Sequence, residues 1–246
     1  MLVTPFGSCR IEHVAHTTQL NKLTSYTHCT KEAIQLIKYV KGDLKFDAPH
    51  DMFCLRASIK NGKPLEYISK FKELFDNTDV FVVEISSMKK YIYEDKYLTH
   101  MAVDKRLFDQ DYKNTPQHII DETKVVLQTD QEIENDILEI QKLLGPKPMI
   151  VVSHTNVTHH GDKLEKRDHL IKLLEKVCKR QGIMFINPTT LMTQFEQRDL
   201  IEPDLGHHLP IAKHVVYNHI NMCVSYLTKK GDFYKRYPDT PVFLHS

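Results

Sequence analysis

The sequence lacks an excess of charge of either sign. Its 33 Lys and Arg residues nearly balance its 32 Asp and Glu residues, and the formal net charge is +1. A protein that binds nucleic acid usually presents a broad basic surface, so we expect no nucleic-acid partner. No apolar run approaches the length of a membrane span, so we expect no membrane partner either.

Cysteine is also scarce, and no Cys-x-x-Cys pair occurs. The five cysteines are odd in number and scattered along the chain: Cys9, Cys29, Cys54, Cys178 and Cys223. This usage is typical of reduced thiols in an intracellular protein. The N-terminus has no basic-then-apolar signal pattern. We therefore predict a cytoplasmic location.

A metal-binding motif is absent as well, although the chain has fifteen histidines. Three groups of them could share one rim of the fold: His154, His159-His160 and His207-His208. Adjacent histidines seldom bind one ion together, and no His-Glu-x-x-His spacing occurs. We expect neither a metal nor another cofactor.

Short apolar runs alternate with amphipathic segments along the chain. Runs at residues 2–6, 52–55, 79–85, 149–152 and 183–186 predict strands, and amphipathic patterns at 130–144, 163–180 and 210–228 predict helices. Strands that alternate with helices build a parallel sheet. We predict one α/β domain over residues 1–246, a three-layer sandwich with a mostly parallel central sheet. The polar, tyrosine-rich segment 88–127 is predicted to be an insertion after the third strand.

Two short motifs near opposite ends of the chain carry the chemistry. Gly7-Ser8 directly follows the first predicted strand, and a hydroxyl at that place lies at the open edge of a parallel sheet. Asp204-Leu205-Gly206-His207 precedes the last predicted helix. In such a loop the carboxylate can bind the imidazole Nδ1–H and leave Nε2 to accept a proton from a serine.

The order of these motifs resembles that of the SGNH/GDSL hydrolase superfamily. The form Gly7-Ser8-Cys9 is closest to its GSCFA-like branch. The resemblance implies an SGNH/flavodoxin-like fold in which Ser8 is the nucleophile, His207 the general base and Asp204 the residue that orients it. It also implies that the Ser8 backbone N–H joins the oxyanion hole.

The middle motifs of that family, a Gly after the second strand and a Gly-x-Asn after the third, do not match this chain. The remaining candidates for oxyanion or substrate contacts are Gly7, Ser86, Ser87 and Asn156. Ser86, Ser87 and Asn156 each have an ordinary alternative role in a turn or loop cap.

Several alternatives stay open. His208 competes with His207 as the base, and Cys9 with Ser8 as the nucleophile. We predict a serine esterase or deacylase acting on a small-molecule or glycan acyl ester, for example an acetyl group on a carbohydrate. An O-acyltransferase that modifies a polysaccharide or glycan and a non-catalytic binding protein on the same scaffold are the other interpretations.

Overall fold

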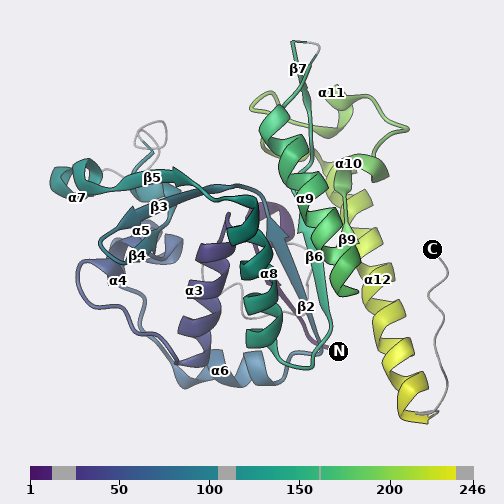
Figure 1. Ribbon diagram of the computed structural model, residues 1–246, viewed down its shortest axis with the longest axis horizontal. Coiled ribbons are helices and arrows are strands. Elements are labelled where there is room, and N and C mark those ends of the chain that lie inside the picture. The colour runs from purple at the N-terminus through teal and green to yellow at the C-terminus, as the bar shows by residue number, and fades with distance from the viewer. Residues whose placement is uncertain (13–25, 105–114, 161, 237–246) are drawn as a thin grey trace.

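A parallel sheet of four strands forms the centre of the computed structural model, which describes residues 1–12, 26–104, 115–160 and 162–236 (Figure 1). Its strands are β1 (Val3–Phe6), β2 (Val80–Ile85), β6 (Met149–Ser153) and β9 (Met184–Ile186), in that spatial order. All three neighbouring pairs run parallel. The predicted α/β fold with a mostly parallel sheet is confirmed.

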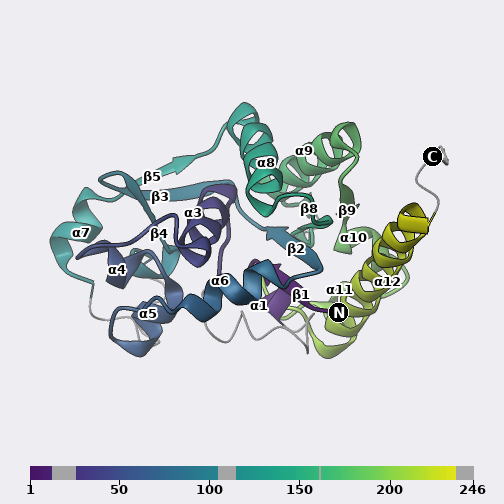
Figure 2. The ribbon, with the colours of Figure 1, turned by 90° about the horizontal axis from the view of Figure 1, so that it is seen from below.

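Helices cover both faces of this sheet (Figures 1 and 2). One face packs against α3 (Thr30–Lys41), α6 (Ser69–Asp76), α8 (Asp130–Leu144) and α9 (Glu165–Gln181). The opposite face packs against α1 (Cys9–Glu12), α12 (Pro210–Arg236) and the segment that carries α10 (Pro188–Leu191) and α11 (Gln197–Leu200). The fold therefore has three layers, with the parallel sheet between two layers of helices.

Alternation along β2 decides which side chains face which layer. Phe81, Val83 and Ile85 belong to the core under α3 and α8, whereas Val80 and Val82 belong to the core under α12. Because side chains alternate along a strand, Glu84 points to the same face as Val80 and Val82. A buried carboxylate therefore lies on the face that also carries α1.

Helix α8 shows how local sequence sets these elements. Thr129 and Glu132 form a reciprocal capping box at its start. Its buried positions recur at helical spacing: Ile133, Ile137, Ile140 and Leu144.

The prediction of a strand at residues 52–55 is wrong. This part of the chain forms two short helices, α4 (His50–Phe53) and α5 (Arg56–Asn61). Phe53, Cys54 and Leu55 are buried as expected, but a run of three or four apolar residues does not distinguish a buried strand from a buried helix. The insertion therefore follows the second strand of the central sheet instead of the third.

The segment 88–127 builds a small antiparallel sheet of its own. Strands β3 (Lys89–Tyr93), β4 (Lys96–Leu98) and β5 (Lys124–Leu127) pair in the order β4-β3-β5. The 3-10 turn η1 (His100–Ala102) and helix α7 (Gln117–Glu122) connect them, and residues 105–114 lie outside the described part. The assignment of residues 1–246 to one domain stays a prediction.

Three further findings bear on the predictions. A short hairpin of β7 (Thr158–His159) and β8 (Asp162–Lys163) follows β6.

All five cysteines are free thiols. In the part of the chain that the structure describes, no helix combines the length and apolarity needed to cross a bilayer.

Candidate active site

Gly7 and Ser8 lie where β1 ends and α1 begins. Phe6 pairs with Val83 of the neighbouring strand, so Gly7 comes next to Glu84. A Cβ atom on Gly7 would lie 2.6 Å from the Glu84 Cβ, closer than two carbon atoms can approach. The glycine is therefore required by the neighbouring strand.

We expect Gly7→Ala to destabilise the protein by about 1–3 kcal/mol, because the sheet must open to admit the methyl group. Urea denaturation measures the change in the free energy of unfolding. Gly62→Asn is the control, because nothing lies within 4 Å of the Gly62 Cβ position and asparagine tolerates its positive φ. Equal stability of the Gly7→Ala variant and the wild type would contradict the close approach.

Glu84 binds the predicted nucleophile. Its Oε2 accepts the Ser8 hydroxyl at 2.5 Å and the Ser8 backbone N–H at 2.8 Å, and its Oε1 accepts Arg10 Nε at 2.9 Å. Burial alone would raise the pKa of the Glu84 carboxyl, but the charge of Arg10 and the bonds from Ser8 outweigh it and lower the pKa. Glu84 is an anion that holds the serine.

Asp204 and His207 are paired in the loop before α12. His207 Nδ1 bonds to Asp204 Oδ2, while Asp204 Oδ1 accepts the backbone N–H groups of Gly206 at 2.8 Å and His207 at 3.0 Å. Burial opposes ionisation of Asp204, yet these bonds lower its pKa to about 2. The carboxylate is therefore charged and fixes the orientation of the imidazole.

Two arginines hold this loop through its carbonyl oxygens. Arg10 Nη1 donates to the Gly206 carbonyl at 2.5 Å, and Arg167 Nη1 donates to the Leu205 carbonyl at 2.7 Å. Leu205 has a φ of 57°, a left-handed conformation that is strained for leucine. Because Arg10 also binds Glu84, one side chain joins the Ser8 turn to the His207 loop.

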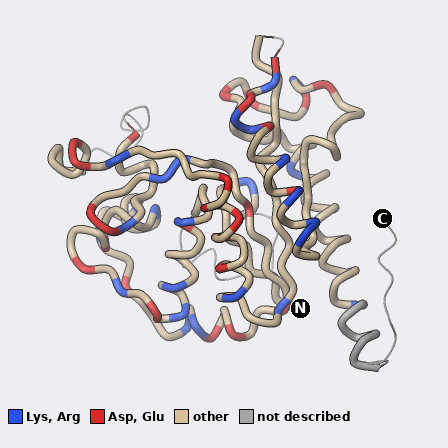
Figure 3. The backbone as a smooth tube through the Cα atoms, viewed as in Figure 1, with Lys and Arg blue, Asp and Glu red and all other residues tan. Residues whose placement is uncertain are grey.

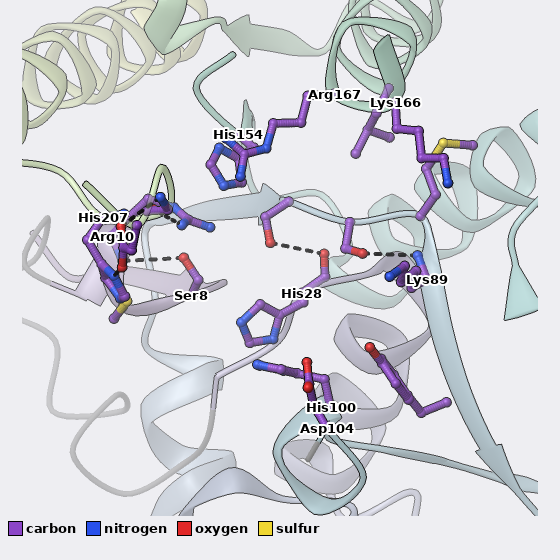
Figure 4. Close-up of a pocket in the computed structure, with 18 of the residues that line it drawn as sticks. Ser8, Arg10, His28, Lys89, His100, Asp104, His154, Lys166, Arg167 and His207 are labelled. Atoms are coloured by element: carbon purple, nitrogen blue, oxygen red, sulfur yellow. Dashed lines mark hydrogen bonds and ion pairs between the residues drawn. The ribbon is translucent and has the colours of Figure 1, made fainter. Parts of the chain in front are cut away.

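A cavity of about 620 Å³ joins these groups (Figure 4). Ser8, Arg10, Asp204 and His207 line one part of it, and Met88, Lys89 and Tyr91 of the insertion line another. Among the described residues, four cationic side chains line the cavity, Arg10, Lys89, Lys166 and Arg167, against two carboxylates, Asp104 and Asp204. In the rest of the described chain, positive and negative residues are intermixed (Figure 3), so the excess of cations is confined to the cavity.

The structure brings the three predicted triad residues into one cavity but does not join all of them. Asp204 binds His207, and both line the cavity with Ser8. The Ser8 hydroxyl donates to Glu84, and among the described residues it has no hydrogen bond with His207. The link from serine to imidazole is therefore not formed in this state.

The candidate oxyanion donors are engaged elsewhere. The backbone N–H groups of Ser86 and Ser87 both donate to the His28 carbonyl at 2.9 Å. The Ser87 hydroxyl accepts the Lys89 N–H, and the Ser86 hydroxyl lies 3.4 Å from the same His28 carbonyl. Ser86 and Ser87 do line the cavity.

Asn156 has a structural role in this state. Its backbone N–H donates to Thr189 Oγ1 at 2.7 Å, and its side-chain oxygen accepts the Val157 N–H. The residue is buried and is not one of those that line the cavity.

The alternatives to Ser8 and His207 also have defined places. His208 is buried, and its Nε2 bonds to Thr155 Oγ1 at 2.6 Å. Burial, with the charge of Arg10 as a second cause, lowers the pKa of His208 to about 4. Cys9 is half-buried and lines the cavity beside Ser8.

We expect acid to destabilise the protein through His208. Its pKa is lower in the folded state, so the unfolded state binds more protons between pH 6.5 and 4, and stability falls as the pH drops through this window. A shift from 6.5 to about 4 corresponds to roughly 3 kcal/mol. Thermal midpoints measured from pH 7 to pH 4 should show a shallower loss for His208→Gln. Parallel curves would contradict this origin.

The histidines considered as metal ligands lie in different places. The tilted rings of His159 and His160 are in contact in the β7–β8 hairpin, whereas His154 and His207 line the cavity. Among the described residues, donor atoms of Glu202, Asp204 and His207 lie within 4.8 Å of one another, as do those of His50, Glu94 and Asp95. Both oxygens of Asp204 already accept hydrogen bonds, which favours an orienting role over metal binding.

The family model of the TviD N-terminal domain matches residues 1–110 and 99–222, which is most of the chain. The chain belongs to the TviD N-terminal domain family. A curated relative, the Vi polysaccharide biosynthesis protein TviD of Salmonella typhi, is 23% identical over 253 residues. That alignment covers 84% of this chain and 29% of the relative, so the chain spans less than a third of the length of TviD.

A solved structure is also similar to this TviD N-terminal domain family member. It is a mutant of Axe2, an acetyl-xylooligosaccharide esterase from Geobacillus Stearmophilus. The TM-score is 0.36 at 10% identity, and the alignment covers 65% of this chain and 68% of that one.

Sequence reasoning missed three residues of the site: Glu84, Arg10 and Arg167. Glu84 had a usable signal, because it is the single charged residue inside the apolar run 80–85. A charge in a strand covered on both faces is rare unless it is paired. Arg10 follows the Gly-Ser-Cys turn directly, but neither it nor Arg167 has a spacing that identifies its partner.

Proposed function

We propose that this protein acts on acyl esters of carbohydrates through Ser8, His207 and Asp204, as an SGNH-type serine esterase or deacylase. The observation that carries the proposal is the hydrogen-bonded Asp204–His207 pair, which lines the same cavity as Ser8 although the motifs lie at opposite ends of the chain. The GSCFA-like motif and the acetyl-ester activity named for the Axe2 esterase agree with it but do not carry it. The cytoplasmic location stays a prediction.

The reaction follows from the roles of these side chains. Ser8 Oγ turns from Glu84 towards His207, gives its proton to Nε2 and attacks the carbonyl carbon of the ester. The carbonyl π electrons move to the oxygen. When the tetrahedral intermediate collapses, the alcohol leaves with the proton from His207, and the acyl group stays on Ser8. Water then attacks the acyl group on Ser8 in the same way and gives a proton to His207. The acid leaves, and His207 returns the proton to Ser8 Oγ.

The lining of the cavity favours a polar, negatively charged substrate. Lys89 and Lys166 are exposed, and neither has an ion-pair partner among the described residues. Arg167 lines the same cavity, and burial lowers its pKa only to about 10, so it stays charged at neutral pH. Cations that converge on a cavity attract anions and raise their local concentration. We expect the ester to lie on a sugar that carries acidic groups.

An O-acyltransferase is the second candidate, and one observation favours it. The alignment with the relative named for Vi polysaccharide biosynthesis covers 84% of this chain, and biosynthesis points to adding groups more than removing them. The site would be the same, with a sugar hydroxyl replacing water as the acceptor. The third candidate, a non-catalytic binding protein, is favoured by the hydrogen bond that holds Ser8 on Glu84.

One assay separates these three functions. The protein is incubated with an acetylated acidic oligosaccharide, and with p-nitrophenyl acetate plus the unacetylated oligosaccharide as acceptor. Free acetate as the main product indicates the esterase. Acetylated acceptor in excess over acetate indicates the transferase. No turnover of either ester, with retained binding of the oligosaccharide, would contradict both enzymatic functions.

A further inference from the structure

An acyl-transfer site needs donors for the negative charge that develops on the carbonyl oxygen, and the expected donors are occupied here. The Ser8 backbone N–H, which the family resemblance assigns to this role, donates to Glu84 Oε2 at 2.8 Å. The backbone N–H groups of Ser86 and Ser87 donate to His28. If the proposed function holds, another group beside Ser8 has to bind the oxyanion.

The Arg10 side chain lies where such a donor is required. The Arg10 backbone nitrogen is 3.3 Å from Ser8 Oγ. The side chain of Arg10 lines the cavity together with Ser8 and His207 (Figure 4). A guanidinium has five N–H groups in a planar fork. The bonds to Glu84 and to Gly206 use one N–H at Nε and one at Nη1. The other N–H groups of the two terminal nitrogens have no hydrogen-bond acceptor among the residues that the structure describes.

The two bonds also hold the guanidinium in a fixed place. Glu84 is buried in the central sheet and Gly206 belongs to the His207 loop, so Arg10 is anchored on both sides of the reacting centre. Only 9% of its side chain is exposed. A donor that is already oriented and shielded from water stabilises a developing charge without reorganisation at the moment of reaction.

Two other nitrogen-bearing residues of the cavity, His154 and Arg167, fit the role less well. His154 Nδ1 lies 2.7 Å from the Thr155 carbonyl, which can only accept, so Nδ1 carries the proton. Burial and the nearby arginines lower the pKa of His154 well below its usual range, so the ring is neutral and Nε2 is an acceptor. Arg167 lies across the cavity from Ser8 in Figure 4.

We propose that Arg10 is a catalytic residue whose guanidinium donates hydrogen bonds to the oxyanion in place of a backbone oxyanion hole. As Ser8 Oγ bonds to the carbonyl carbon, its proton passes to His207 Nε2 and the π pair moves onto the carbonyl oxygen, which accepts N–H groups of Arg10. On collapse the pair returns to the carbonyl, the C–O bond to the alcohol breaks, and His207 returns the proton to the leaving oxygen. The guanidinium keeps all its protons throughout.

The test compares an ester with its thionoester, in which sulfur replaces the carbonyl oxygen. Sulfur accepts hydrogen bonds poorly, so an enzyme that stabilises an oxyanion by hydrogen bonding discriminates strongly against it. Arg10→Gln and Arg10→Lys are measured with both substrates, and kcat is expressed per active site titrated with a fluorophosphonate. Arg198→Gln is the control, because Arg198 is exposed and pairs only with Glu196 among the described residues.

For Arg10→Gln we expect kcat on the oxygen ester to fall about 10²–10³-fold, the cost of losing an oxyanion donor, with a much smaller change in KM. The ratio of ester to thionoester rates should shrink with it. Arg10→Lys should lie between this variant and the wild type. Loss of position alone would slow both substrates equally and leave the ratio unchanged, and that result would overturn the proposal.

Failure of the proposed function gives a different result. In that case the wild type itself shows no turnover and no fluorophosphonate label on Ser8, before any Arg10 variant is made. If instead the wild type turns over and Arg10→Gln keeps the wild-type rate ratio, the function stands and the role of Arg10 is wrong.

Discussion

Ser8→Ala is expected to abolish acyl-ester turnover, with a fall in kcat of about 10⁴–10⁶-fold, as for other serine nucleophiles. Labelling by a fluorophosphonate probe should disappear at the same time. The variant also loses the hydroxyl that donates to Glu84, a hydrogen bond to a charged group worth about 1.5–3 kcal/mol. Because Glu84 keeps its bonds from Arg10 and from the Ser8 backbone, we expect a less stable but folded protein.

The measurement pairs the activity assay with circular dichroism, which shows that the variant is folded. Ser69→Ala is the matched control, because Ser69 is an exposed residue at the first position of α6, remote in sequence from either motif. A Ser8→Ala variant that is still labelled would assign the nucleophile to another side chain, with Cys9 the first to test.

Asp204→Asn is expected to lower kcat about 10³–10⁴-fold with little change in KM. The asparagine amide can still accept the backbone N–H groups of Gly206 and His207, so the loop should keep its shape. It lacks the charge that stabilises the imidazolium and no longer selects the tautomer in which His207 Nε2 accepts a proton. Kinetics from pH 5 to pH 9 measure the loss.

Asp199→Asn provides the control, because Asp199 is an exposed carboxylate in α11 of the same region. The exposed position of Asp204 predicts a small change in the thermal midpoint, so lost activity could not be assigned to unfolding. If Asp204→Asn kept its activity while a His208 variant lost it, the base would be His208 and the hydrogen bond from Asp204 would be structural.

The sequence was sufficient for features that depend on residues close together in the chain. Asp204 and His207 are three residues apart, and an aspartate in a Pro/Gly loop bonds to the N–H groups two and three residues on. The strands at 80–85 and 149–153 are long apolar runs that suit a sheet covered on both faces. The position of Ser8 at the edge of the sheet could be predicted because a Gly-Ser turn ends such a strand.

Features that depend on distant contacts could not be predicted in the same way. Arg10 is 74 residues from Glu84 and 196 residues from Gly206, and no periodicity links them. The Ser8 hydroxyl could donate to Glu84 or to His207. It donates to Glu84 in this structure because the pairing of β1 with β2 places that carboxylate beside it. The apolar run 52–55 is too short to show whether its hydrophobic pattern has the period of a strand or of a helix. Tertiary packing determines that this region forms helices.

The most direct test of the central claim is to trap the covalent intermediate. The protein is mixed with p-nitrophenyl acetate, quenched in acid within the first turnovers and digested for mass spectrometry. We predict that the peptide containing Ser8 gains the mass of one acetyl group, that fragmentation places the group on Ser8, and that Asp204→Asn forms the adduct more slowly. An acetyl group on any other residue, or turnover with an unmodified Ser8, would contradict the account.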